Sequence, residues 1–366
     1  MNITLVISSL SAGGAERVLS SLANYWDSKD HNVAIITLAS DAAFYPLSET
    51  INLKQINQIS ANDERFLRRI CNIVKRLYFL RKAIQKTKAD VVVSFVDVTN
   101  ITTLIACVGL KIPVVVSERT NPFYHKISIL FRWLRNFLYP YAKNVIVQTK
   151  SAASYFDGLK NIAAIPNAVH ENEHITKDFS KPITHIISVG RLCPHKGFST
   201  LIKAFSEILK LNKDLKLTIY GEGADRSNLE SLKRSLNIGG SVFLPGAVSE
   251  INDVLVNADL FVFPSHYEGF PNALCEAMAA GLPVIVSNCS GNIDVVQDGV
   301  NGRLFPIGDV DRLVLLMKEL ISDPLQCQKL SQNAMTLSDH YSPDKIYQLW
   351  DAVIEDAVPS LQKGLV

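Results

Sequence analysis

Short apolar runs alternate with amphipathic segments along the whole chain. The apolar runs lie at residues 3–10, 33–39, 91–96, 112–119 and 144–149, and again at 185–192, 215–223, 242–248, 260–266 and 282–288. Amphipathic segments such as 16–26 and 200–211 separate them and have helical spacing. Buried strands that alternate with helices are typical of parallel sheets built from βαβ units. This pattern occurs twice, which predicts an α/β protein with two doubly wound sheets.

A polar segment at 167–182 interrupts the pattern. It has no apolar period and ends in Pro182. We therefore predict a first Rossmann-like domain at 1–166, a linker at 167–182 and a second Rossmann-like domain at 183–340. The remainder, 341–366, contains a helix at 344–358 that comes too late in the chain to serve the second sheet. In such domains ligands bind outside the carboxyl ends of the strands, so the chemistry is sought in those loops.

Composition narrows the class of protein. Of the 366 residues 48% are hydrophobic and 20% charged, enough to build two cores. The six cysteines form no C-x-x-C pair, which favours reduced thiols in the cytoplasm and no zinc site. The N-terminus has no basic stretch before its apolar run, and no apolar segment reaches the ~20 residues of a spanning helix. We expect a soluble protein, at most associated with a membrane surface.

Two glycines follow the first apolar run, at Gly13 and Gly14, and a helical pattern begins there. Glycine allows a ligand close to the backbone, and a helix N-terminus attracts phosphate. The spacing is not that of a dinucleotide fingerprint, so a plain strand–helix turn explains it equally well.

Two further loops carry more specific chemistry. Arg191 and Lys196 flank a turn after the first strand of the second domain, where they can neutralise a diphosphate; a solvated basic loop is the alternative. Later, Glu268 precedes Pro271, which suits a first helical position. Glu276 follows in an apolar helix, where an unpaired carboxylate is costly, and ribose hydroxyls are suitable partners.

Together these loops resemble glycosyltransferase family 4. Glu268 and Glu276 form its E-x7-E pattern, and the segments 13–17, 190–197 and 298–302 occur in the order that the family has. The resemblance covers essentially the whole chain. It implies the GT-B fold, in which two Rossmann-like domains face a central cleft and the last helix crosses back to the first domain. It also implies sugar transfer from a nucleotide, usually UDP, with retention at the anomeric carbon and without a metal or other cofactor.

Roles carried over from the family follow position by position. Arg191 and Lys196 resemble the diphosphate-binding pair, with Glu268 beside them in the catalytic set. Glu276 resembles the ribose ligand, and Gly14 the glycine near the phosphates. The residues that resemble the family's donor-sugar contacts are Glu268 and the backbone of Gly269, Phe270, Pro271 and Asn272.

The chain departs from the family in two places. Where many members have a histidine near the reacting sugar, this chain has Glu118 and Arg119. Arg119 is a candidate for contact with phosphate or acceptor, and a structural Glu118–Arg119 pair is the alternative. The family's G-P-x-E stretch reads 291–294 here. Two decoys are set aside: 221–223 lacks the third glycine of a dinucleotide site, and 309–311 suits helix capping better than a metal.

A basic helix at 64–88 concentrates charge in the first half. Residues 1–165 carry a net charge of +9 and residues 166–366 a net charge of −7. One face is predicted to be apolar, through Phe66, Ile70, Ile73, Leu77, Leu80 and Ile84. Opposite lie Arg65, Arg68, Arg69, Lys75, Arg76 and Lys82, with Phe79 among them. An ordinary surface helix explains this; contact with anionic lipid or a lipid-diphosphate acceptor is the functional hypothesis, with Arg68, Lys75 and Lys82 as acceptor-side residues.

The first half most resembles bacterial transferases that add N-acetylgalactosamine to undecaprenyl-diphosphate-linked oligosaccharides, through residues 13–17, 94–100 and the basic helix. We therefore expect a cytoplasmic glycosyltransferase, peripheral at the inner face of the membrane, that moves a UDP-linked N-acetylhexosamine to a lipid-linked or cell-surface glycan. A nucleotide-sugar epimerase and a non-catalytic nucleotide-sugar binding module remain alternatives. Nucleic acid is not an expected partner.

Overall fold

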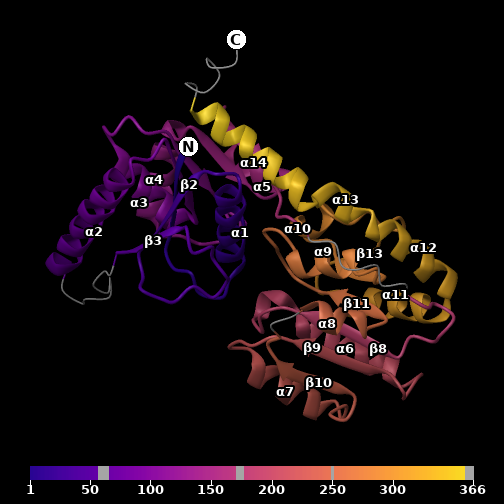
Figure 1. The fold of residues 1–366 in the computed structure, drawn as a ribbon. Coiled ribbons are helices and arrows are strands. Elements are labelled where there is room, and N and C mark those ends of the chain that lie inside the picture. The colour runs from indigo at the N-terminus through magenta and orange to yellow at the C-terminus, as the bar shows by residue number, and fades with distance from the viewer. Residues whose placement is uncertain (57–65, 170–176, 249–250, 359–366) are drawn as a thin grey trace. The chain divides into compact units, whose positions relative to one another are not determined.

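The chain forms two compact units, each a parallel sheet with helices on both faces (Figure 1). The computed structural model describes residues 1–56, 66–169, 177–248 and 251–358, and the side chains of its longest helix from residue 71 onward. Unit 1 comprises Met1–Asn167 and the C-terminal segment from Asp344, and unit 2 comprises Ala168–Pro343. The predicted α/β class with two Rossmann-like sheets is confirmed.

The sheet of unit 1 has seven parallel strands in the order β3-β2-β1-β4-β5-β6-β7. The strands are β1 Asn2–Ile7, β2 Asn32–Thr37, β3 Asn52–Gln55, β4 Val91–Phe95, β5 Val114–Ser117, β6 Asn144–Val147 and β7 Ile162–Ala164. The central strands β1, β4 and β5 are buried almost throughout, as their continuous apolar runs predict.

Helices cover both faces of this sheet. On one face α2 (Phe66–Thr87), α3 (Asp97–Cys107) and α4 (Ile129–Leu138) share one core with the strands. On the other face Trp26 of α1 (Gly14–Ser28) meets Trp350 of α14 (Pro343–Ala357), and Trp350 stacks on Phe95 of β4. Short helices η1 (Tyr139–Tyr141), α5 (Lys150–Ala153) and η2 (Ser154–Phe156) complete the unit.

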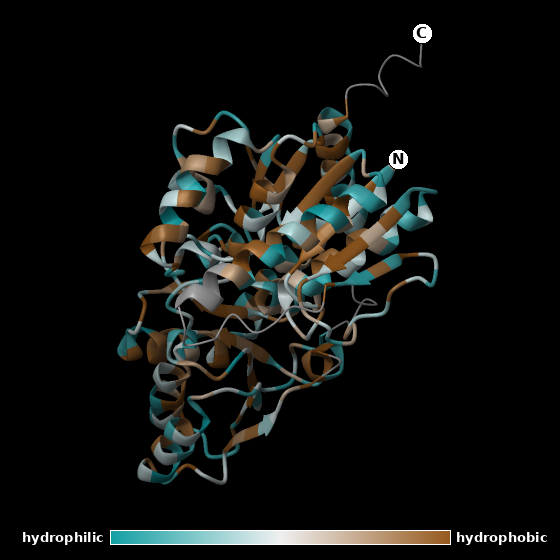
Figure 2. Cartoon of the chain, turned by 90° about the vertical axis from the view of Figure 1, so that its left-hand side faces the viewer, coloured by the Kyte–Doolittle hydropathy of each residue, from teal (hydrophilic) through white to brown (hydrophobic). Residues whose placement is uncertain are grey.

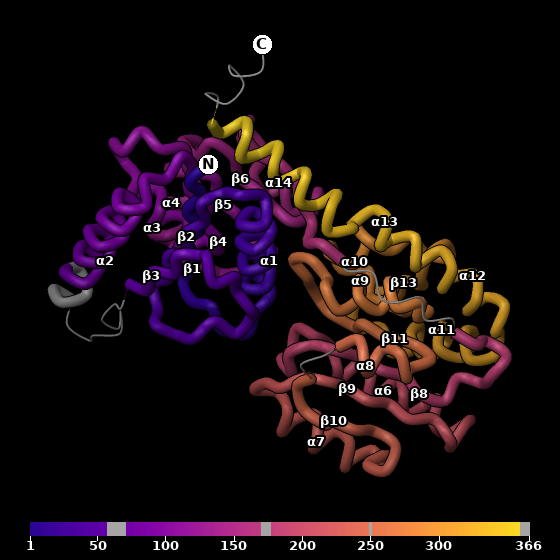
Figure 3. Tube along the Cα trace, in the orientation of Figure 1, coloured from indigo at the N-terminus to yellow at the C-terminus, as the bar shows by residue number. Residues whose placement is uncertain are grey.

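The C-terminal helix α14 belongs to unit 1 although unit 2 precedes it in the chain (Figure 3). Asp351 accepts hydrogen bonds from Tyr25 Oη at 2.6 Å and from Trp26 Nε1 at 2.9 Å. Burial and the Asp351 carboxylate raise the pKa of Tyr25 to about 12. The predicted return of the last helix to the first domain is therefore confirmed.

Unit 2 has six parallel strands in the order β10-β9-β8-β11-β12-β13. They are β8 His185–Val189, β9 Lys216–Tyr220, β10 Val242–Gly246, β11 Leu260–Phe263, β12 Val284–Ser287 and β13 Arg303–Phe305. One face packs on α6 (Phe198–Leu209), α7 (Arg226–Ser235), α11 (Val310–Ser322) and α12 (Pro324–Met335). The other packs on α8 (Ile251–Val256), α9 (Asn272–Ala279) and α13 (Leu337–Tyr341).

Three strands escaped the sequence analysis, and all three are edge strands: β3, β7 and β13. Each has only three or four residues, and β3 is mostly exposed. Edge strands need no continuous apolar run, because one side of the strand faces solvent. The inner strands, in contrast, are predominantly hydrophobic (Figure 2).

Helix α2 follows its predicted apolar face only in part. Leu80 and Ile84 are fully buried and Leu77 packs against the core, but Ile73 is 48% exposed. The prediction for Ile73 is wrong because the N-terminal half of the described helix extends past the sheet core that its C-terminal half covers. Phe66 and Ile70 have side chains outside the described set. Among the described residues, no helix is both long and apolar enough to cross a bilayer.

Candidate active site

Two loops of unit 2 are locked together at the carboxyl ends of the neighbouring strands β8 and β11. Gly197 follows η3 (Pro194–Lys196) at φ +67°, and a Cβ there would lie 2.1 Å from the Pro264 carbonyl oxygen. The His266 N–H donates to the His195 carbonyl at 2.7 Å, and the His195 ring stacks on Tyr267. Only glycine combines the positive φ at position 197 with the absence of a Cβ that would collide with Pro264. The Gly197 in the predicted loop therefore fixes where Lys196 stands.

Lys196 and Glu268 form an ion pair between these loops. Lys196 Nζ lies 2.6 Å from Glu268 Oε1, and it sits 4.9 Å from the centroid of the Phe263 ring. The two side chains are only 16% and 10% exposed. A partly buried ammonium in this position needs a negative partner, and Glu268 supplies one. The sequence analysis assigned both residues to the catalytic set but did not predict that they bind each other.

The stretch 291–294 supports Glu268 from behind. It lies in the short helix α10 (Ser290–Ile293), where a Cβ on Gly291 would come within 2.7 Å of Glu268 Cβ. Asn292 is fully buried and donates to the Ser287 carbonyl at 2.9 Å, which holds α10 on β12. The stretch therefore helps to position Glu268. The sequence alone did not assign it a role, because it departs from the family's G-P-x-E pattern.

Arg191 is exposed on the β8 loop, five residues before Lys196. The loop is supported by Gly221, at φ +147°, where a Cβ would lie 1.9 Å from the Gly190 carbonyl oxygen. Glu222 Oε1 forms an ion pair with Arg226 Nη2 at 2.6 Å. The glycines of 221–223 therefore serve close backbone packing.

Helix α9 begins at Asn272, one residue later than predicted, and Pro271 is its N-cap. The Asn272 N–H donates to the Phe270 carbonyl at 3.0 Å, and Pro271 has no N–H. Ligand-facing donors in 269–272 can therefore only be those of Gly269 and Phe270. The Phe270 side chain packs on Tyr341 in the core, and Glu276 is half-buried on α9.

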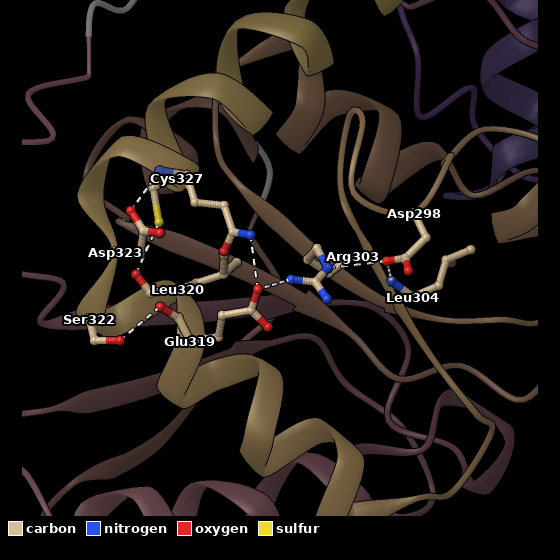
Figure 4. A network of polar contacts seen from close by, with 9 residues as sticks. Asp298, Arg303, Leu304, Glu319, Leu320, Ser322, Asp323 and Cys327 are labelled. Atoms are coloured by element: carbon tan, nitrogen blue, oxygen red, sulfur yellow. Dashed lines mark hydrogen bonds and ion pairs between the residues drawn. The ribbon is translucent and has the colours of Figure 1, made fainter.

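The two remaining motif stretches of unit 2 are structural. Asp309 caps α11 by accepting the Arg312 N–H at 2.9 Å, which confirms the capping interpretation of 309–311. Asp298 accepts the Leu304 N–H at 2.8 Å and binds Arg303 at 3.2 Å, and Arg303 also binds Glu319 (Figure 4). The stretch 298–302 is thereby tied to β13 and α11. Within the described residues, no three His, Cys, Asp or Glu side chains are grouped as a metal site.

In unit 1, Gly14 is the exposed first residue of α1, at the carboxyl end of β1. Arg119 lies at the carboxyl end of β5 and is 91% buried. Its guanidinium stacks on Phe95 at 4.9 Å and on Trp350 at 5.4 Å, and donates to Asn167 Oδ1 at 2.9 Å. Its Nε and Nη2 have no hydrogen-bond partner among the described residues, and burial lowers its pKa to about 9.

Glu118 points away from Arg119 into a buried polar network. Tyr139 donates a short hydrogen bond to Glu118 Oε1, and Arg135 lies 3.8 Å from the same oxygen. Burial raises the pKa of Glu118 to about 7, although Tyr139 and Arg135 oppose the shift. The alternative of a structural Glu118–Arg119 pair is therefore not what the structure shows; Arg135 is the cation beside Glu118.

A histidine that the sequence analysis missed lies nearby. His125 Nε2 is 3.1 Å from Asp97 Oδ2, and this contact raises the pKa of His125. Asp97 opens α3 directly after Val96, which has the strained φ of +74°. A strained β-branched residue that aims a buried carboxylate at a half-exposed histidine is typical of a functional loop. His125 lies six positions after Arg119, so no local motif identifies it.

The acceptor-side residues of α2 are described only in part. Lys75 and Lys82 are exposed, whereas Arg65 and the side chains of Arg68 and Arg69 lie outside the described residues. Phe79 is 46% exposed and lies against a cavity of about 470 Å³ that Lys54, Lys82 and Lys86 also line. The aromatic ring among the cations is thus part of a basic pocket with an apolar floor.

The two parallel-sheet units define the GT-B fold. Residues 12–173 match the family model of Glycosyltransferase Family 4, and residues 171–336 match that of Glycosyl transferases group 1. The chain belongs to these glycosyltransferases, and it is an enzyme of the transferase class.

Relatives and solved structures agree with this assignment. The chain is 29% identical, over 97% of its length and 99% of the relative, to a Campylobacter jejuni enzyme named as an α-1,4-N-acetyl-D-galactosaminyltransferase of a diphospho-undecaprenol-linked glycan. It is 28% identical, over 68% of its length and 71% of the relative, to an Escherichia coli enzyme named UDP-Gal:α-D-GlcNAc-diphosphoundecaprenol α-1,3-galactosyltransferase. Its fold matches Anabaena HepE in complex with UDP and glucose, with a TM-score of 0.80 at 19% identity over 97% of this chain and 99% of HepE.

Proposed function

We propose that this glycosyltransferase moves an N-acetylhexosamine from UDP to a lipid-linked glycan, with retention at the anomeric carbon, at the inner face of the cytoplasmic membrane. The observation that carries the proposal is the Lys196–Glu268 pair, held at 2.6 Å where β8 and β11 end side by side. The N-acetylhexosamine and the lipid-linked acceptor rest on the likeness to the Campylobacter jejuni enzyme, which is named for both.

The ion pair suggests an exchange of partners when the donor binds. A diphosphate carries more charge than one carboxylate, so it competes with Glu268 for Lys196 and recruits the exposed Arg191. Glu268 then accepts hydrogen bonds from hydroxyl groups of the donor sugar. As the bond from the anomeric carbon to the diphosphate oxygen breaks, negative charge builds on that oxygen, and Lys196 and Arg191 stabilise it.

The remaining donor contacts come from α9 and its entry. The N–H groups of Gly269 and Phe270 face the ligand at the N-terminal end of this helix, where anionic and hydroxyl groups are favoured. Glu276 is proposed to accept the ribose hydroxyls. Because two cations already neutralise the diphosphate, we propose that the reaction needs no added divalent ion.

The acceptor is proposed to bind unit 1. Lys75, Lys82 and the side chain of Arg68 are the candidate ligands of its diphosphate, and the pocket beside Phe79 combines lysines with an apolar floor, which suits a lipid phosphate. Arg119 is proposed on the acceptor side as well, because its Nε and Nη2 have no hydrogen-bond partner among the described residues and can donate to an anionic or hydroxyl group.

A donor screen tests this function. Purified protein is incubated with UDP- and GDP-sugars and extracted lipid-linked acceptors in EDTA, and released nucleotide and modified lipid are read together. Transfer from a UDP-N-acetylhexosamine, with an α-linked product by NMR, is the expected result. Nucleotide release without modified lipid, or an altered free sugar nucleotide, would contradict the acceptor class and favour an epimerase. Binding without turnover on every acceptor would indicate a binding module.

A further inference from the structure

Helix α4 exposes an unusual set of large apolar side chains. Ile129 is 77% exposed, Trp133 60% and Tyr141, just beyond the helix, 74%. Leu130 and Phe137 are also exposed. Scattered apolar residues on a surface need no explanation, but a contiguous group of this size marks an interaction surface. We call these five residues the α4 ridge.

The ridge is continuous and ordered. Ile129, Trp133 and Phe137 are spaced four residues apart, so they lie on one face of the helix. Trp133 and Phe137 stack with their ring centroids 5.6 Å apart, and Phe137 and Tyr141 follow at 5.9 Å. The opposite face of α4 already packs on the sheet through Phe131, Leu134 and Leu138. The ridge is therefore a second apolar face of α4, separate from the one that packs on the core of unit 1.

An apolar groove extends the ridge toward α3. It has a volume of about 710 Å³ and lies between Phe137 and Tyr141 on one side and Leu104, Val108 and Ile112 on the other. Val108 is itself 66% exposed. A groove of this size beside exposed aromatic rings can hold a hydrocarbon chain. A flat protein partner would need no such groove.

The charge around the ridge indicates which partner covers it. From Arg119 to Phe156 the sequence contains six lysines and arginines and no aspartate or glutamate. Of these cations Lys126 and Arg132 are exposed at the start of α4. Lys75 and Lys82 project from α2, which lies in the same helix layer. Tryptophan and tyrosine beside lysine and arginine are typical of the boundary between lipid headgroups and acyl chains.

We propose that the α4 ridge docks this protein on an anionic lipid bilayer. Trp133 and Phe137 enter the boundary between headgroups and acyl chains, and Lys126 and Arg132 bind headgroup phosphates. The inference rests on the proposed function only in placing the acceptor in a membrane; it concerns bilayer binding, which is measurable without donor or acceptor.

Tryptophan fluorescence offers a selective test, because the chain has three tryptophans and two of them are fully buried. Trp26 and Trp350 are 0% exposed, so Trp133 is the one that lipid can reach. The protein is mixed with vesicles of phosphatidylglycerol and phosphatidylcholine whose acyl chains carry bromine. We expect a blue shift and quenching of Trp133, and none in Trp133→Phe, which keeps an apolar side chain. Unchanged wild-type emission at saturating vesicle concentration would overturn the proposal.

Sedimentation with the same vesicles separates the ridge from general stickiness. Trp133→Ser with Phe137→Ser should lower the fraction bound by about tenfold or more, because the inserted area is lost. Leu211→Ser with Leu325→Ser is the matched control: both leucines are exposed in unit 2, at 67% and 78%, and the double variant should bind as the wild type does. Equal loss in both double variants, or none in either, would contradict the assignment to α4.

Charge and activity give two further readouts. Lys126→Ser with Arg132→Ser, or 0.5 M salt, should weaken binding to anionic vesicles and leave the weaker binding to neutral vesicles unchanged. The ridge variants should keep transfer to a detergent-dispersed acceptor and lose transfer to the same acceptor in vesicles. Loss of both would place the ridge in the acceptor site instead of the docking surface. Self-association of the wild type that the ridge variants abolish, without vesicle binding, would identify a second copy as the partner.

Discussion

Each unit has a largely buried cation at the carboxyl edge of its sheet, Lys196 in unit 2 and Arg119 in unit 1, and the two have different partners. Lys196 in unit 2 has a carboxylate partner 2.6 Å away and is 16% exposed. Arg119 in unit 1 is more deeply buried, yet its neighbours are two aromatic rings and one amide oxygen. The structure shows no carboxylate bound to Arg119 among the described residues.

Under the proposed function, the difference separates a site that exchanges ligands from one that is built into the core. A phosphate can replace a carboxylate as the partner of a cation, so we propose that an anionic donor displaces Glu268 from Lys196. Aromatic rings cannot leave, and Trp350 comes from α14, so Arg119 also connects the strand edge to the last helix. Removal of either cation should thus affect different properties: turnover for Lys196, and packing with acceptor binding for Arg119.

The largest expected effect is that of Lys196→Ala on turnover. Loss of a cation at the leaving group should lower kcat by about 100- to 1,000-fold, because charge developing in the transition state is no longer stabilised. Lys203→Ala on the exposed surface of α6 is the control and should keep wild-type kcat. Steady-state nucleotide release at saturating donor measures both; a Lys196→Ala enzyme within threefold of wild type would remove Lys196 from the reaction.

The next largest effect is a pH dependence of the free energy of unfolding of unit 1. The pKa of Glu118 is raised from 4.5 to about 7 by burial, so the folded state holds a proton that the unfolded state releases between these values. The stability of unit 1 should therefore fall as the pH rises from 5 to 8, by about 2–3 kcal/mol from this group.

Urea unfolding followed by tryptophan emission measures this fall, because all three tryptophans lie in unit 1. Glu118→Gln keeps the shape without the titration, and its stability should fall less over the same range. Equal slopes in the two proteins would show that Glu118 stays ionised beside Arg135.

A smaller effect is expected for Glu276→Ala. If Glu276 accepts the ribose hydroxyls, its loss should weaken UDP binding by about tenfold, the size of one charge-assisted hydrogen bond, with little change in kcat. Calorimetry with UDP and with ribose-lacking inorganic diphosphate provides the comparison. Equal weakening for both ligands would contradict the assignment of Glu276 to the ribose.

The smallest effect is expected for the stability of Arg119→Met. Methionine can fill the space between Phe95 and Trp350 without a buried charge, so unfolding of unit 1 should change by no more than about 1 kcal/mol. Arg119→Ala should cost about 2–4 kcal/mol, because it leaves a cavity. With its fold intact, Arg119→Met should still show a raised KM for the acceptor; an unchanged KM would restrict Arg119 to packing.

The sequence predicted most of the fold because inner parallel strands are continuous apolar runs, and it missed β3, β7 and β13 because these three short edge strands are not. It also selected Lys196 and Glu268 as candidates, and the structure brings their side chains to 2.6 Å from each other; their roles in the reaction stay predictions. The Asp97–His125 contact could not be predicted, since it joins two loops through the pairing of β4 with β5. The support of Glu268 by Gly291 likewise depends on packing between elements that no local pattern encodes.

Calorimetric titration of UDP in EDTA into wild type, Lys196→Ala and Lys203→Ala shows whether the Lys196 loop binds a diphosphate. UDP carries on its terminal phosphate the charge that develops on the leaving group. We expect wild type and Lys203→Ala to bind UDP equally without a divalent ion, and Lys196→Ala to bind it about tenfold or more weakly. Binding that appears only when Mg²⁺ is added, or equal affinity in all three proteins, would contradict the claim that the Lys196 loop holds the diphosphate.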